Sequence, residues 1–197
     1  TAILIGQGWA SMSKLGSMRA TSVDISDNNL PSVRLLGEIK YLITRHRVWV
    51  LRRNMAEDEA TTRSVVDRMN GVLVGFASTA EKYEPLIGGT EERDLWTTFK
   101  KEWSQYLVMQ DEIVRLKASG RSADAAKLFN DSVALFDQVV AELEKSIALN
   151  DGEARASTER AEATYHDAWL TILLLTAASV GIALAAGVFI VFGITRP

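Results

Sequence analysis

The sequence contains no cysteine, only three prolines and only two histidines among its 197 residues. Without cysteine, the chain forms neither a disulfide scaffold nor a thiolate zinc site. His46 and His166 are too few and too far apart in sequence to suggest a metal site, so we expect no metal and no cofactor. No stretch alternates apolar and polar residues in the way that a half-buried strand does, and the class that remains is helical.

Charge is absent from residues 168–195, between Asp167 and Arg196. A helix of about 28 residues reaches about 42 Å, whereas a bilayer core needs about 20 mostly apolar residues. The alternative, a buried core helix, rarely runs so far without a charge. The composition therefore predicts a transmembrane helix at 168–195.

The two ends of the sequence suggest further membrane elements. The first charged residue is Lys14, and residues 1–13 are predicted to be the end of a truncated first transmembrane helix. The alternative is the remnant of a cleaved signal peptide. Arg196 after the span favours the cytoplasmic side, and Pro197 stops the helix there, so 196–197 would start a linker. Residues 14–167 would then form one extramembrane domain.

The net charge of −3 argues against a nucleic-acid partner. No nucleophile elbow, metalloprotease helix or phosphate-binding loop occurs, so we predict no enzyme and no catalytic residue. Neighbouring carboxylates at 57–59 and 91–92 lie at expected helix starts, where they complement the helix dipole.

Helical periodicity runs through most of the chain. The expected helices span 3–54, 58–84, a third segment capped by Thr90 and a fourth capped by Ser122 that continues to 195. Gly152 weakens the fourth helix without breaking it. The predicted fold class is all-α: an antiparallel up-down-up-down four-helix bundle whose last helix continues into a transmembrane helix. The expected apolar seams are Leu35, Ile39, Leu42 and Trp49; Val65, Met69, Val72, Phe76 and Tyr83; and Phe99, Trp103, Tyr106, Gln110 and Ile113.

The fourth helix has a stripe with strict 3–4 spacing, as in a coiled coil. Its side chains change from large apolar ones to small ones toward the span. Its members are Val133, Phe136, Val140, Leu143, Ile147, Asn150, Ala154, Ser157, Ala161, Thr164 and Ala168.

Pro31 interrupts the first helix, because an interior proline removes a ladder bond and clashes with the preceding turn. We favour one kinked helix, in which residues 27–29 satisfy loosened backbone groups. The alternative is two helices that meet at a cap, with Asn29 ending one or starting the next.

The stretch Asp27-Asn28-Asn29-Leu30-Pro31-Ser32-Val33 resembles the N-x-x-P-S motif in the first helix of the periplasmic four-helix-bundle sensor domains of methyl-accepting chemotaxis proteins. Thr195-Arg196-Pro197 is similar to the entry to a HAMP linker, and the layout of the whole chain matches. The resemblance implies a homodimer in the bacterial inner membrane, with the sensor in the periplasm. It also implies cytoplasmic kinase-coupling partners, reached through a C-terminal module outside this sequence. It implies ligand anions bound by arginines of the first helix and, in some members, by a tyrosine of the third, which Tyr106 matches.

A cationic run, Arg45 to Arg53, ends the first helix. The spacing predicts that one helix face is shared by Arg45, Trp49, Arg52 and Arg53. Guanidinium groups beside an indole suit a small organic anion. Antiparallel packing brings residues of the third and fourth helices to the same membrane-distal end. The alternatives are a solvated basic face balanced by residues 57–59 and ordinary aromatic core. The predicted ligand-binding residues are Arg45, His46, Trp49, Arg52, Arg53, Trp103, Tyr106, Gln110, Phe129 and Ser132.

The leading functional hypothesis is the sensory input domain of a chemoreceptor, which binds a small organic anion or amino acid and signals through the fourth helix. The alternatives are the input domain of a membrane histidine kinase or cyclic-dinucleotide enzyme, a module that senses through a periplasmic binding protein, and a purely structural membrane-anchored bundle.

Overall fold

The computed structural model describes residues 12, 16, 19, 23 and 25–195, and every regular element within them is helical. The predicted all-α class is therefore confirmed. The segment 1–13, apart from Met12, and the linker start at 196–197 lie outside the described residues. In chain order the elements are η1 (Ile25–Asn29), α2 (Leu30–Asn54), α3 (Glu59–Tyr83), η2 (Glu84–Leu86), α4 (Thr90–Ala118) and α5 (Ser122–Thr195).

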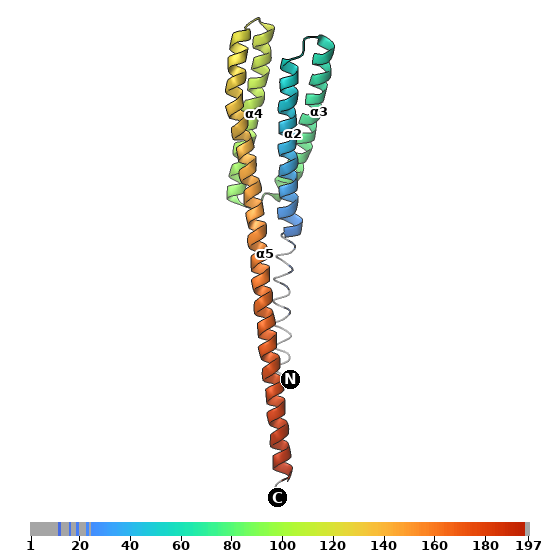
Figure 1. Cartoon of the computed structure of the whole chain (residues 1–197), viewed down its shortest axis with the longest axis vertical. Helices are drawn as coiled ribbons and strands as arrows, with labels where there is room; N and C mark the ends of the chain where they lie inside the picture. The colour runs from blue at the N-terminus through green and yellow to red at the C-terminus, as the bar shows by residue number, and fades with distance from the viewer. Residues whose placement is uncertain (1–11, 13–15, 17–18, 20–22, 24, 196–197) are drawn as a thin grey trace. The chain divides into compact units, whose positions relative to one another are not determined.

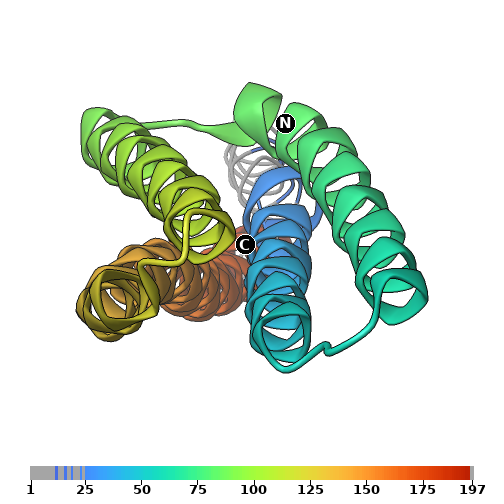
Figure 2. The same ribbon diagram turned by 90° about the horizontal axis from the view of Figure 1, so that it is seen from above.

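Residues 27–153 form one compact unit, in which α2, α3, α4 and the first part of α5 make the predicted antiparallel bundle. The connections α2–α3 and α4–α5 lie at one end (Figure 1), which we call the Gly120 end; it contains residues 55–58 and 119–121. The α3–α4 connection, residues 84–89, lies at the opposite end, which we call the Pro85 end. Seen from above, the four helices surround a common core (Figure 2).

Helix ends follow local side-chain chemistry, with two corrections to the expected caps. The Asp58 carboxylate accepts a hydrogen bond from the Thr61 N–H at 2.7 Å and caps α3. Thr90 is instead the first residue of α4, and Gly89 occupies the cap position without a side-chain bond. Ser122 is likewise the first residue of α5, where the Ala125 N–H donates to the Arg121 carbonyl. Gly120 adopts φ +77°, a conformation that glycine enters without steric cost.

The core lies along the predicted seams of α3 and α4. On α2 the predicted seam was partly wrong, because Ile43 and Val50 are buried where Leu42 and Trp49 were expected. Tyr83, Phe99 and Tyr106 are fully buried, and Trp96 stacks on Phe99 with ring centroids 5.0 Å apart. Such aromatic pairs add stabilisation beyond their buried area. The central buried cluster contains Leu35, Leu36, Ile39, Ile43, Tyr83, Trp96, Phe99, Trp103, Tyr106, Phe136, Val139 and Leu143.

One position of the fourth-helix stripe was predicted wrongly. Val133 is 41% exposed, and Ser132 is fully buried in its place. The Ser132 hydroxyl donates to the Phe129 carbonyl at 2.7 Å, so this polar side chain enters the interior with its hydrogen bond satisfied.

Glu92 organises the Pro85 end, although it was expected to serve the helix dipole. Its side chain is 4% exposed and accepts three hydrogen bonds: from the Tyr83 hydroxyl at 2.7 Å, from the Asn150 amide at 2.7 Å and from the Gly88 N–H at 2.9 Å. Burial, followed by the bond to Glu92, raises the pKa of Tyr83 above its usual range. The carboxylate thus joins α3, α4 and α5.

Pro31 lies within a continuous run of helical residues, as favoured. The preceding turn, Ile25–Asn29, is a π-helix, whose wider turn is a recognised way to relieve a clash in the helix ladder. Asn29 makes no capping bond; its amide instead donates to Glu153 Oε2 at 3.4 Å and the Asn150 carbonyl at 3.5 Å, both on α5. Asn29 thus ends the π-turn and directly precedes α2, as the two-helix alternative had it, but its backbone is helical and no capped break separates the two elements.

The second unit includes residues 154–195 of α5. The small-residue stripe continues here: Ser157 is buried, and Ala161 and Thr164 are partly covered. Farther along, the helix is long and apolar enough to cross a membrane, and its large side chains are exposed, with Phe189 at 80%. The last helix therefore continues into a transmembrane helix.

Candidate functional site: an arginine–tryptophan pocket beside a buried polar cluster

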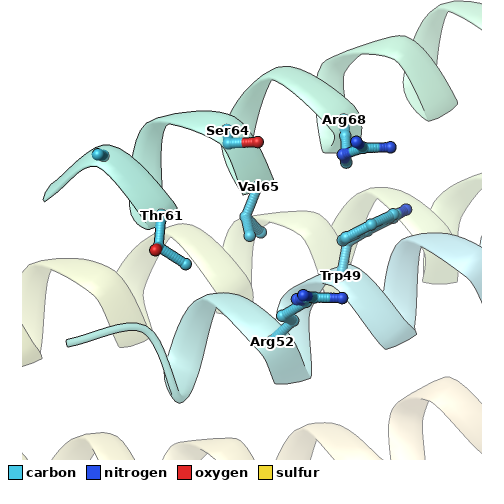
Figure 3. A pocket seen from close by; sticks show the side chains of 7 residues that line it. Trp49, Arg52, Thr61, Ser64, Val65 and Arg68 are labelled. Atoms are coloured by element: carbon cyan, nitrogen blue, oxygen red, sulfur yellow. The ribbon is translucent and has the colours of Figure 1, made fainter. Parts of the chain in front are cut away.

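A pocket of about 540 Å³ lies between α2 and α3 near the Gly120 end (Figure 3). We call it the Trp49 pocket. Its lining residues are Trp49, Arg52, Ala60, Thr61, Ser64, Val65 and Arg68. Two of the predicted residues, Trp49 and Arg52, therefore belong to it, because the 3–4 spacing of α2 turns both toward α3.

Trp49 carries two guanidinium groups over its ring. The Arg68 guanidinium carbon lies 5.2 Å from the ring centroid and that of Arg52 lies 5.7 Å from it. In Figure 3 the indole lies between the two arginine side chains. Each contact is a cation–π attraction, which holds a flexible arginine in place without neutralising its charge.

Neither of these arginines has a carboxylate partner among the ion pairs of the described residues. Two of the acidic residues 57–59, which were expected to balance these charges, interact with other groups. Asp58 caps α3, and Glu59 pairs with Arg63 at 2.7 Å. The pocket therefore presents two positive charges whose bidentate hydrogen-bonding edges are unused.

Arg45 lies one turn before Trp49 and lines an adjoining pocket of about 300 Å³ with Trp49 and Arg68. Its guanidinium donates to the Tyr41 hydroxyl at 2.6 Å. Arg53, by contrast, is half-buried at the end of α2 and lines neither of these pockets. The arginines of the predicted cationic run therefore do not all line the same surface: Arg45 and Arg52 line pockets beside α3, whereas Arg53 does not.

The other predicted residues lie on the inner side of α2. His46 is 1% exposed and meets the Trp103 and Tyr106 rings edge-on, at centroid distances of 5.3 and 6.3 Å. Trp103 and Tyr106 stack on each other at 5.3 Å. These contacts unite α2 and α4 in the core, so His46 does not share the Trp49 pocket.

Arg47, which was not among the predicted residues, completes this interior group. Its guanidinium donates to the Tyr106 hydroxyl at 3.2 Å and to the Ser132 hydroxyl at 3.1 Å. It also lies over the rings of Phe129, Phe136 and Tyr106, at 4.9, 5.5 and 5.6 Å. The signal for it was its position, four residues after buried Ile43 and three before buried Val50.

Several polar atoms in or near this group have no hydrogen-bond partner within the described part of the protein. They are His46 Nδ1, Trp103 Nε1 and Gln110 Nε2; the fourth such atom, Glu102 Oε2, lies one residue from Trp103. Gln110 is 5% exposed. Unsatisfied buried groups of this kind cost free energy unless a ligand or water completes them.

Burial dominates the electrostatics of the interior group. It lowers the pKa of His46 to about 4, and the opposing effect of Asp111 is smaller. The imidazole is therefore neutral at physiological pH. Burial also raises the pKa of Tyr106, against the lowering effect of Arg47.

We call the interior group the His46 cluster; it contains His46, Arg47, Trp103, Tyr106 and Ser132. Gln110 lies about one helical turn beyond Tyr106 on α4. The structure thus distributes the predicted residues over two places. Trp49 and Arg52, with Arg45 adjoining, face α3; the others except Arg53 lie in or beside the His46 cluster, where Phe129 covers Arg47. Arg68 was missed because it lies on α3, where no cationic run marks it.

In the part of the chain that the structure describes, no group of three His, Cys, Asp or Glu residues could hold a metal ion. What the arrangement offers is cationic, aromatic and hydrogen-bonding surface, which suits binding rather than bond-breaking.

No curated protein matches the chain. A family model described as a four-helix-bundle sensory module for signal transduction matches residues 1–165. That match covers every residue of both groups described above. The chain therefore belongs to the family of four-helix-bundle sensory modules of chemoreceptors.

Proposed function

We propose that the chain is the sensory input domain of a bacterial chemoreceptor and that it binds a small organic anion in the Trp49 pocket. The observation that carries this proposal is the pair of guanidinium groups of Arg52 and Arg68, which flank Trp49 without a carboxylate partner. A carboxylate ligand would supply the missing charge through charge-assisted hydrogen bonds.

The remaining lining determines which anions fit. The Ser64 hydroxyl is exposed and makes no hydrogen bond to other described residues, so it is available to the ligand. The Val65 side chain forms an apolar floor at 3% exposure. Two cations, one hydroxyl and an apolar floor suit a compact mono- or dicarboxylate.

An amino acid is the second ligand type of the same proposal. A neighbouring pocket shares Ala60, Ser64 and Arg68 with the Trp49 pocket and adds Arg63 and Asp67. The Asp67 carboxylate lies where it could receive an ammonium group while Arg68 holds the carboxylate. Comparing an amino acid with the corresponding deaminated acid tests whether Asp67 contributes.

The signal would pass through α5, which is one helix from Ser122 to Thr195. Ligand binding would shift an equilibrium between two helix arrangements, and the small-residue stripe around Ala161 would form the close-packed face of a homodimer. The sensor would lie in the periplasm, with the apolar part of α5 in the inner membrane.

The binding test uses the full chain in nanodiscs and a thermal-shift screen of small carboxylates, aromatic acids and amino acids. A ligand at 100 times its Kd adds about 2.7 kcal/mol, a rise of roughly 5–10 °C. Arg52→Gln and Arg68→Gln should each weaken binding by at least about tenfold, or 1.4 kcal/mol. The matched control is Arg115→Gln, because Arg115 is an exposed arginine that pairs with Glu112 and lines none of these pockets. Unchanged affinity in both variants, or no hit in the panel, would refute the proposal.

The dimer test exploits the absence of cysteine. A single Ala161→Cys chain in membranes should oxidise to a covalent dimer faster than a Glu159→Cys chain, since Glu159 lies on an exposed face. Equal rates would count against the stripe as the dimer contact.

A further inference from the structure

A second pocket, of about 300 Å³, lies at the Gly120 end between the end of α2, the end of α4 and the start of α5. We call it the Phe129 pocket. None of its lining residues belongs to α3, and it shares no residue with the Trp49 pocket. It is therefore a separate recess of the same bundle.

The walls of the Phe129 pocket are mostly apolar. Ile113 and Ala125 form a buried base with 1% and 0% exposure, and the half-buried Phe129 ring packs against them. Leu51 and Met55, also in the lining, are 42% and 80% exposed at the rim. Apolar surface left open to water in a concave site is a common mark of ligand binding.

One cation, Lys117, belongs to the lining, and the lining contains no carboxylate. The Lys117 ammonium donates to the Asn54 carbonyl at 3.1 Å, and it has no acidic partner among the ion pairs of the described residues. An ammonium group has three donors, so this bond leaves two for a ligand. The charge of the pocket therefore favours an anion over a cation.

Size and composition together specify the ligand. A volume near 300 Å³ lies at the lower limit for small-molecule sites. Apolar walls with a single cation match a molecule with one carboxylate and a compact apolar body. A dicarboxylate would have to bury its second charge against Phe129 and Ile113, which is costly.

Phe129 connects this pocket to the interior. The same ring that lines the pocket lies 4.9 Å from the Arg47 guanidinium. An occupant that displaces the ring would alter the surroundings of Arg47 and its bonds to Tyr106 and Ser132. Occupancy of the Phe129 pocket therefore has a direct route into the His46 cluster.

We propose that the Phe129 pocket is a second ligand site, which binds a small apolar monocarboxylate through Lys117 and the Phe129 wall. This site goes beyond the proposed anion site, because it lies on different residues and offers one cation where the Trp49 pocket offers two. Each of the two sites is testable with the other one disabled.

The experiment follows the binding of 4-fluorophenylacetate to the full chain in nanodiscs by ¹⁹F NMR. In the Arg68→Gln background, which disables the Trp49 pocket, Lys117→Met should weaken binding about tenfold or more. In the same background Ala126→Phe, which fills the pocket from an exposed lining position, should abolish it. Lys127→Met is the matched control, because Lys127 is exposed on α5 and does not line the pocket. The neutral amide of the probe should bind far more weakly than the acid.

Arg68→Gln separates the two sites, since it disables the Trp49 pocket and should leave probe affinity within about twofold. Loss of probe binding in Arg68→Gln, or unchanged binding in Lys117→Met and Ala126→Phe with native circular dichroism, would overturn the proposal. Equal binding of acid and amide would overturn the role of Lys117. Affinity that falls as protein concentration rises would assign the pocket to a second copy of the chain and overturn the small-molecule site.

Discussion

The two ends of the bundle treat their polar groups in opposite ways. At the Pro85 end, Glu92 satisfies three donors, and the Trp96 indole donates to Glu84 at 3.0 Å. From the middle toward the Gly120 end, the Trp103 indole on the same helix has no partner within the described chain. Buried groups that are fully paired fix a structure, whereas unpaired ones leave free energy for a ligand to recover.

The cations that line pockets follow the same division, although exposed ion pairs such as Arg63–Glu59 and Arg121–Asp124 also occur at the Gly120 end. Glu84 near the Pro85 end pairs with Lys100 at 2.7 Å, and this bond, ahead of the one from Trp96, lowers the pKa of the carboxyl. At the Gly120 end, Arg52, Arg68 and Lys117 face pockets without acidic partners. The Pro85 end is thus held together by paired polar groups, whereas the Gly120 end presents cations that are available to a ligand.

The largest expected effect comes from removing the Glu92 carboxylate at the Pro85 end. Glu92→Ala leaves the Tyr83 hydroxyl, the Asn150 amide and the Gly88 N–H without their acceptor. At about 1–3 kcal/mol for each buried group, the free energy of unfolding should fall by roughly 4 kcal/mol. Urea unfolding of the full chain in nanodiscs measures it. The exposed neighbour provides the control, since Glu91→Ala should change stability by less than about 0.5 kcal/mol; similar losses in both variants would remove the special role of Glu92.

Lowering the pH should reduce the free energy of unfolding, because the buried His46 imidazole is neutral in the folded protein. Its pKa is about 4 in the folded protein and about 6.5 when unfolded, so the unfolded state binds the extra proton between these values. Stability is therefore full above pH 6.5 and is lost as the pH falls to 4, by about 3 kcal/mol. Unfolding curves across this window, compared with those of His46→Gln, isolate the contribution. The same pH slope in both proteins would contradict the buried neutral imidazole.

Arg47 tests whether the interior cation stabilises the bundle without a carboxylate. Arg47→Met keeps the apolar stem but loses two hydrogen bonds and three ring contacts, so we expect a loss of about 2 kcal/mol. Arg45→Met, which removes an exposed cation two residues earlier, should cost less than about 0.5 kcal/mol. Thermal melts of both variants measure the difference in stability. If Arg47→Met leaves the protein equally stable or stabilises it, the buried guanidinium destabilises the protein unless a ligand is bound.

The smallest expected effect separates stability from binding. Gly37 lies on an exposed face of α2, and a Cβ added there would meet nothing within 4 Å. Gly37→Ala should stabilise the protein by about 0.5–1 kcal/mol through helix propensity. Carboxylate affinity at the Gly120 end should not change, which parallel unfolding and titration experiments would check. A coupled change in affinity would mean that the two regions are not independent.

Helix phase explains how much of the fold was predictable. The seams through Val65 and Phe99 were correct because burial in a bundle repeats with the helix period. The caps at Thr90 and Ser122 were each wrong by one residue, since several neighbouring residues can end a helix at similar cost. Val133 was wrong because a serine with a satisfied hydroxyl can take an interior place.

The candidate site was only half predictable for a different reason. Trp49 and Arg52 share a face within one helix, and sequence spacing reveals this. Arg68 joins them only because α2 and α3 pack in one particular rotation and axial offset, which depend on the whole core. Arg47 is a cation among aromatic rings, a position where a hydrophobic residue is the ordinary expectation.

The π-turn at Ile25–Asn29 affects how heptad positions are assigned along the first helix. A turn of this kind contains one more residue than an α-turn closed by the same ladder, so it resets the rotational phase by about 100°. A heptad assigned from Leu35 and Ile39 therefore cannot be extended backwards through residues 25–29 without a one-residue frame shift.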